Sequence, residues 1–251
     1  MDSDKATQDR LDVVFRALSL ASLLKRAEIE IAIHNLTDFP VEIDIKEEVY
    51  RKQYDTNRLL RDWVIDEKIQ PHLTVHEKEL LSRELGEWPP QETLQIGWRV
   101  ESLGMLLWAL GALANIPYFD TQFEPDEVLE PIDILTPTID FVWQATLRPA
   151  DQLHYARYLA ELWQWRAQSY LFEKEGMQPS SDLTLDEIIR MTATQEHKDG
   201  ALHRLIDEDF AAFDKAYRDL SEDQAALAAS IANERYQVMN WLCAYSDWQE
   251  A

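Results

Sequence analysis

The sequence has little cysteine, little glycine and few basic residues. Cys243 is the only cysteine among 251 residues, so the chain can form no internal disulfide and offers no cysteine cage for a metal ion. Six glycines and few stretches of strict apolar–polar alternation favour helices over strands. The N-terminal stretch MDSDKATQDR is polar and charged where a signal peptide would be apolar. We therefore expect a helical, cytoplasmic protein.

The common motifs of nucleotide binding and hydrolysis are also missing. The chain contains no GxxxxGK loop, no GxGxxG loop and no GxSxG elbow. None of the six histidines follows a glutamate by three positions, as a helical carboxylate di-metal site requires. His72 and His76 flank Thr74, a predicted helix start, so their rings need not share a face. We predict no metal and no cofactor.

Acidic residues outnumber basic ones by 47 to 24, which gives a formal net charge of −23. Such a surface repels phosphate backbones and anionic membranes, so we predict neither a nucleic-acid nor a membrane partner. The uncharged run from Ser102 to Phe119 is interrupted by Asn115 and Pro117, which favours a buried core helix over a membrane span. The acidity serves solubility, the imitation of a nucleic acid, or the capture of a basic protein partner, for instance a toxin neutralised by an immunity-like protein.

Helical spacing of apolar residues predicts helices over 11–33 and 48–67, and prolines crowd the middle of the chain. The alternating segment 39–45 predicts a short extended piece. Capping boxes predict three further helix starts, which are Thr74 with Glu77, Thr184 with Glu187, and Ser221 with Gln224. The fold class is therefore all-α. We expect a single compact multi-helix domain over 1–251, with Pro-rich connections and at most a minor extended segment near 39–45. The oligomeric state is left open.

The stretch WRVESLGMLLWALG, residues 98–111, supplies the first candidate site. On a helix, Glu101 shares one stripe with Trp98 and Trp108, and a buried carboxylate needs a partner or a wet cleft. Glycines recur every seven residues, which predicts a second stripe where a neighbouring helix approaches closely; they are Gly97, Gly104 and Gly111.

The stretch NERYQVMNWL, residues 233–242, supplies the second group of candidate site residues. Adjacent helical residues point about 100° apart, so Glu234 and Arg235 need different partners. We expect Glu234 to pair with Arg99 and Arg235 to pair with Glu101 across two packed helices. The cluster is either a structural brace or a binding groove. Its candidate residues are Trp98, Arg99, Glu101, Trp108, Glu234, Arg235, Asn240 and Trp241.

Several blocks together resemble a bacterial family known as domain of unknown function 4272. They are WRVESLGMLLWALG, LRPADQLHYARYLAELWQWRA, LLRDWVIDEKIQPHLTVHEKELL, and the C-terminal block that ends in NERYQVMNWLCAY. The resemblance covers about residues 59–245, and family members often carry glycine and proline near Asp214 and Ala216, where this chain does not. It implies a bacterial, cytoplasmic, all-helical protein and brings no activity with it.

Three functions fit these observations. We favour a binding protein with a basic protein partner over an enzyme, because the chain is strongly acidic and shows no recognisable catalytic set. The enzyme alternative places a Glu/Arg/Trp cleft around Glu101 and Glu234, and it requires a water-accessible pocket there. The third alternative is a structural or assembly protein.

Overall fold

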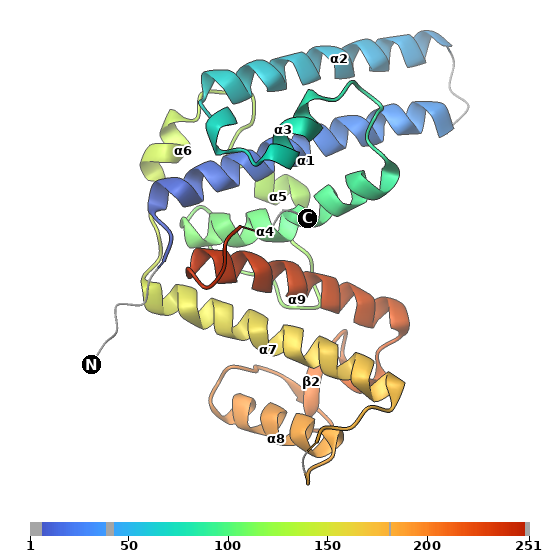
Figure 1. Cartoon of the computed structure of the whole chain (residues 1–251), viewed down its shortest axis with the longest axis vertical. Helices are drawn as coiled ribbons and strands as arrows, with labels where there is room; N and C mark the ends of the chain where they lie inside the picture. The colour runs from blue at the N-terminus through green and yellow to red at the C-terminus, as the bar shows by residue number, and fades with distance from the viewer. Residues whose placement is uncertain (1–6, 39–42, 181, 249–251) are drawn as a thin grey trace.

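The helices α2, α1, α4, α9, α7 and α8 follow one another from the top to the bottom of the molecule in Figure 1, and each packs against the next. The structure is a computed structural model, and it describes residues 7–38, 43–180 and 182–248. The α-helices are α1 (Arg10–Asp38), α2 (Ile43–Asp66), α3 (Val75–Ser82), α4 (Pro90–Ala109), α5 (Pro125–Leu129), α6 (Ile139–Gln144), α7 (Ala150–Glu175), α8 (Leu185–Lys198) and α9 (Glu222–Leu242). Two 3-10 helices, η1 (Gln70–His72) and η2 (Tyr217–Asp219), and the strands β1 (Leu205–Ile206), β2 (Asp209–Ala212) and β3 (Lys215–Ala216) complete the described part.

The mainly helical fold and the three predicted helix starts are confirmed. Each of the helices α3, α8 and α9 begins with a capping box in which the cap side chain accepts a hydrogen bond from the third residue of the helix. In return, the side chain of that third residue accepts from the cap N–H, so two otherwise unpaired donors are satisfied. These local hydrogen bonds fix where the chain enters each helix.

The predicted extended segment over 39–45 is wrong for residues 43–45, which form the first turn of α2, while residues 39–42 lie outside the described residues. Ile43 and Ile45 are exposed, so their alternation with Asp44 does not reflect a buried strand face. Asp44 lies instead in the first turn of the helix, where the partial positive charge of the helix N-terminus favours a carboxylate.

The β structure lies elsewhere, in a small antiparallel sheet of order β1-β2-β3 that falls between α8 and α9 in the sequence. Each hairpin turns on two residues with positive φ, Asp207 and Glu208 in the first, Phe213 and Asp214 in the second. Such turns normally carry asparagine and glycine, and strands of two to four residues are too short to show a period. Both usual signals of a hairpin are therefore missing from the sequence.

Buried apolar side chains form two clusters that share helices. The first core lies among α1, α2, α3 and α4 and includes Leu18, Leu60 and Leu103. The second surrounds Trp163 on α7 and includes Phe210 of the sheet. Helix α9 contributes its N-terminal half to the second core and its C-terminal half to the first. That the chain is one domain over 1–251 stays a prediction, and the shared helices α7 and α9 join its two cores.

Candidate functional site

The two expected ion pairs form where α4 packs against α9. Arg99 Nη1 lies 3.3 Å from Glu234 Oε2, and Arg235 Nε lies 2.8 Å from Glu101 Oε2. The pairing predicted from helical spacing is therefore confirmed. Because Glu234 and Arg235 are adjacent on α9, their side chains diverge and reach different residues of α4.

The Glu101–Arg235 pair is the more deeply buried of the two, with both side chains 0 % exposed. Glu101 Oε1 also accepts a hydrogen bond of 2.9 Å from the Phe123 N–H. Arg235 donates to the Pro117 carbonyl at 2.7 Å and to the Thr121 carbonyl at 3.0 Å. These bonds fasten the loop between α4 and α5 onto the two helices.

The guanidinium group of Arg235 also joins the two apolar cores. Its carbon lies 5.0 Å from the ring centre of Phe119, which belongs to the second core, and 5.1 Å from that of Phe123, which belongs to the first. A cation over aromatic rings is attracted by their negative faces. Arg235 therefore fills the junction between the cores, which is the position of a structural brace.

Burial controls the protonation of these carboxyl groups. It raises the pKa of Glu101 and of Glu234, and in each case the charge of the paired arginine opposes the rise. Burial likewise lowers the pKa of Arg235. The side chain of Glu234, which also accepts a hydrogen bond from Ser102, keeps a small exposed surface, whereas Glu101 keeps none. A cleft open to water at Glu101, which the enzyme alternative requires, is therefore contradicted by the structure.

The remaining predicted residues enter separate contacts. Trp98 packs on the second core, and Trp108 packs on the first, beneath the guanidinium of Arg148. Asn240 accepts a hydrogen bond of 2.6 Å from Arg157, and Trp241 meets Trp248 edge to face. The structure thus brings together Arg99, Glu101, Glu234 and Arg235, while Trp108, Asn240 and Trp241 hold other parts of the fold.

The predicted stripe of close helix contact through the three glycines is wrong. A methyl group at Gly97 would meet no atom within 4 Å, and Gly111 lies past the end of α4 with a φ of +76°. Only Gly104 is closely approached, and its neighbour is the ring of Phe123, a loop residue, rather than another helix. The seven-residue spacing therefore reflects no common packing face.

We expect Gly104→Ala to destabilise the protein, because its methyl group would lie 2.5 Å from the Phe123 ring. Overpacking of this kind typically costs about 1–3 kcal/mol. Gly97→Ala on the same helix is the matched control, and it should stabilise by about 0.5–1 kcal/mol, the usual gain of alanine over glycine in a helix. Urea unfolding of both variants measures the difference, and equal effects would contradict the crowding at Gly104.

A fully buried ion pair between α7 and β2 escaped the sequence reasoning. Arg166 on α7 donates from Nε and Nη2 to the two oxygens of Asp209 on β2, both at 2.8 Å, and both side chains are fully buried. Asp209 also accepts from the N–H groups of Phe210 and Arg218. No periodic pattern links the two partners, because one lies on a helix and the other on a four-residue strand.

A surface segment without basic residues lies on and around α5 and α6. Residues 102–147 contain seven acidic residues and no lysine, arginine or histidine. Asp120 pairs with Arg204, whereas the other six are exposed and form no ion pair within the described part of the chain. We call these six the acidic surface: Glu124, Asp126, Glu127, Glu130, Asp133 and Asp140.

A pocket and an exposed tryptophan accompany the acidic surface. Trp143 on α6 is 79 % exposed, and Ile139, one turn earlier, is 58 % exposed. A pocket of about 420 Å³ opens between the end of α4 and the α5–α6 segment, and Asp140 lines it together with Gln144 and the peptide around Gly111. Exposed aromatic rings beside hollows are common at protein–protein contact sites. The combination of unpaired carboxylates, a large apolar ring and a hollow is therefore suited to a cationic, partly apolar partner.

The fold and the buried pairs define a mainly helical protein with two linked apolar cores. Residues 2–187 match the family described as "Domain of unknown function (DUF4272)", and the chain belongs to this family. The blocks in the sequence suggested a resemblance over about residues 59–245, and the family match overlaps this span over residues 59–187. The match ends before α9. Neither a curated protein nor a solved structure matches the chain. No helix in the described residues combines the length and apolar character that a bilayer-spanning segment needs.

Proposed function

We propose that this protein is a binding protein that takes a basic segment of a partner protein on the acidic surface of α5 and α6. The observation that carries the proposal is the run of six exposed carboxylates without a basic residue between positions 102 and 147. Since a single cysteine makes the fold independent of disulfides, we place this binding in the cytoplasm as part of the same proposal.

Electrostatics support a basic partner for two reasons. The net charge of −23 attracts cations from a distance, which raises the rate of encounter with a basic protein. The unpaired carboxylates then offer local acceptors for lysine and arginine donors. Because surface charges are screened beyond about 8 Å at physiological salt, the affinity should fall as salt is added.

The exposed side chain of Trp143 adds an apolar anchor. A tryptophan this exposed contributes nothing to the core, whereas burial of a large aromatic ring at an interface typically dominates the binding energy. The pocket lined by Asp140 and Gln144 has room for a long basic side chain. We expect an arginine or lysine of the partner to occupy this pocket while a neighbouring apolar side chain covers Trp143.

Neutralising the acidic surface should weaken binding of a short amidated peptide rich in lysine, arginine and leucine by roughly tenfold, about 1.4 kcal/mol. The variant carries Asp126→Asn, Glu127→Gln, Glu130→Gln and Asp140→Asn. A control with the same change in net charge replaces four exposed acids elsewhere that form no ion pair in the described structure, Glu48, Asp55, Glu175 and Asp182, with their amides. Isothermal titration calorimetry at physiological salt measures both.

The comparison of the two variants distinguishes binding at the acidic surface from attraction by the overall net charge. If net charge alone governs binding, the two variants weaken it equally and the proposal is wrong. If the acidic surface is the site, the control loses less than about threefold, and Trp143→Ala weakens binding without changing any charge. Retention of full affinity by the Trp143 variant would remove the apolar anchor from the proposal.

A further inference from the structure

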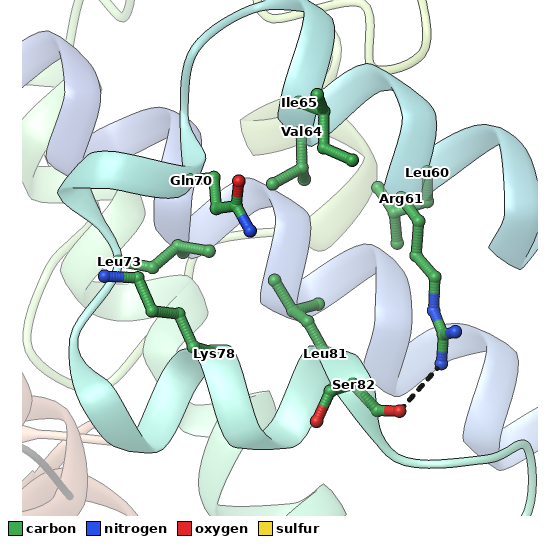
Figure 2. Close-up of a pocket in the computed structure, with 9 residues that line it drawn as sticks. All are labelled: Leu60, Arg61, Val64, Ile65, Gln70, Leu73, Lys78, Leu81 and Ser82. Atoms are coloured by element: carbon green, nitrogen blue, oxygen red, sulfur yellow. Dashed lines mark hydrogen bonds between the residues drawn. The ribbon is translucent and has the colours of Figure 1, made fainter.

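The charged side chains that line a groove between α2 and α3 are basic, whereas the chain as a whole is acidic. It encloses about 220 Å³ and is shown in close-up in Figure 2. Helix α2 forms one wall, α3 forms the other, and η1 with the following residue closes one end. The lining residues are Leu60, Arg61, Val64, Ile65, Gln70, Leu73, Lys78, Leu81 and Ser82.

The groove offers an apolar surface at its base. Leu60, Val64, Leu73 and Leu81 belong to the first core and turn their side chains into the space between the two helices (Figure 2). Ile65 continues this surface outward, because its side chain lines the groove and is largely exposed. Four aliphatic residues beside an open volume favour an aliphatic ligand group over water.

The charged residues at the groove are both basic. Arg61 extends from α2 and Lys78 from α3, on opposite sides of the opening in Figure 2. No carboxylate lines the groove, although acidic residues outnumber basic ones by 47 to 24 in the chain. The rim therefore attracts an anion in a protein whose overall charge repels one.

Arg61 is held in place and keeps donor capacity. Its Nη2 donates to the carbonyls of Ser82 and Arg83, at 3.0 and 2.8 Å, while its buried Nε has no hydrogen-bond partner in the described structure. Arg26 of α1 donates to the same Arg83 carbonyl, so a second guanidinium lies close by. Arg26 is paired with Glu30 at 2.6 Å, with both side chains fully buried, so Arg61 and Lys78 remain the cations that face the groove.

We infer that the groove binds a small amphipathic carboxylate, with its aliphatic chain along the four buried residues and its carboxylate at the rim beside Lys78. The volume of about 220 Å³ exceeds the roughly 150 Å³ that accepts benzene and falls below the roughly 300 Å³ at which drug-sized pockets begin. A short-chain or medium-chain fatty acid has this size. This site is independent of the acidic surface.

The test compares three probes of equal chain length that differ in head group: octanoate, octan-1-ol and octylammonium, each at concentrations below micelle formation. Calorimetry with the wild-type protein should rank octanoate tightest by at least about fivefold, since only the carboxylate is attracted by the basic rim. Amide chemical shifts should move at residues that line the groove, such as Ile65 and Leu73.

Two variants and one control locate the head group and the chain. Lys78→Glu should reverse the order of octanoate and octylammonium, because the exposed Lys78 side chain has no ion pair in the described structure and its replacement changes the rim charge. Val64→Phe should weaken all three probes by filling the groove. Lys52→Glu is the matched control: the same charge change on the neighbouring helix α2, at an exposed residue outside the lining, should alter octanoate affinity less than about twofold.

Other outcomes overturn the inference. Equal affinity for the three probes would leave only unspecific hydrophobic binding, and equal loss from Lys78→Glu and Lys52→Glu would trace binding to net charge. If Val64→Phe folds normally, as shown by circular dichroism, and leaves octanoate affinity unchanged, the aliphatic chain of octanoate does not bind in this groove. If sedimentation shows a dimer that Lys78→Glu dissociates, the groove is an interface between two copies.

Discussion

Arg235→Met should lower the free energy of unfolding by about 3–5 kcal/mol, the usual penalty for breaking a buried ion pair by removing one partner. The variant leaves the carboxylate of Glu101 without its countercharge at a fully buried position. It also leaves the carbonyls of Pro117 and Thr121 without their donor, so the loop before α5 loses its attachment. Urea unfolding followed by circular dichroism measures this loss.

A second substitution should recover part of that stability. Adding Glu101→Gln removes the uncompensated charge, while the amide oxygen can still accept from the Phe123 N–H. The double variant should therefore be more stable than Arg235→Met alone. Arg99→Met is the control, because the Arg99–Glu234 pair keeps some exposure and its loss should cost less. Strict additivity of the two substitutions would show that Glu101 and Arg235 are not energetically coupled.

The pH dependence of Arg235→Met carries a defined sign. Burial raises the pKa of Glu101, and the charge of Arg235 opposes this rise in the wild-type protein. Without Arg235 the pKa should rise further. A carboxyl whose folded pKa exceeds its unfolded value favours the folded state at low pH, and this contribution is lost as the pH rises through the folded pKa. The deficit of the variant should therefore shrink as the pH falls toward about 4.3, the unfolded value.

Asp209→Asn should lower the free energy of unfolding about as much as Arg235→Met does, by about 3–5 kcal/mol at neutral pH. Arg166 is fully buried and would keep only the partly exposed Glu173 as a charged partner. An asparagine offers one oxygen where Asp209 accepts from Arg166 with two. Asp186→Asn is the matched control, since the half-exposed Asp186 pairs with Arg190 and Arg218 at the surface and should cost no more than about 1 kcal/mol.

Lowering the pH should weaken the stability that the Asp209 carboxylate contributes, whereas it favours the folded state at Glu101. Burial alone would raise the pKa of Asp209, but the hydrogen bonds and charge of Arg166 outweigh it and set the pKa below its ordinary value. A lowered carboxyl pKa stabilises the fold above the unfolded value, about 3.9, and this contribution is lost as the pH falls through the folded pKa. The gap between wild type and Asp209→Asn should therefore be widest near neutrality and narrow below about pH 4. A constant gap would show that the charge of Asp209 contributes nothing.

The two proposed binding surfaces differ in charge and in the elements that form them. The acidic surface belongs to the loop–helix segment around α5 and α6, which contains no basic residue of its own. The groove belongs to α2 and α3, and it gathers two cations around an aliphatic base. A basic peptide and a fatty carboxylate should therefore bind the same molecule without competing, which calorimetry with both ligands can measure.

By itself, the sequence determined the features that depend on neighbouring residues. The three capping boxes are complete within four positions each, so the starts of α3, α8 and α9 follow from local hydrogen bonds. Helical spacing also showed that Glu234 and Arg235 need different partners, and the pairing predicted on that basis, Glu234 with Arg99 and Arg235 with Glu101, is the one observed.

Only the tertiary structure decided which side chains are sealed and which face solvent. The Glu101–Arg235 pair has no exposed surface because the loop before α5 closes over it, and nothing within the α4 block specifies that loop's path. The Arg166–Asp209 pair joins a helix to a hairpin whose turns lack glycine. The groove exists only where α2 and α3 leave their aliphatic faces incompletely packed. Burial and concavity depend on contacts between distant segments, and these contacts have no counterpart in local spacing.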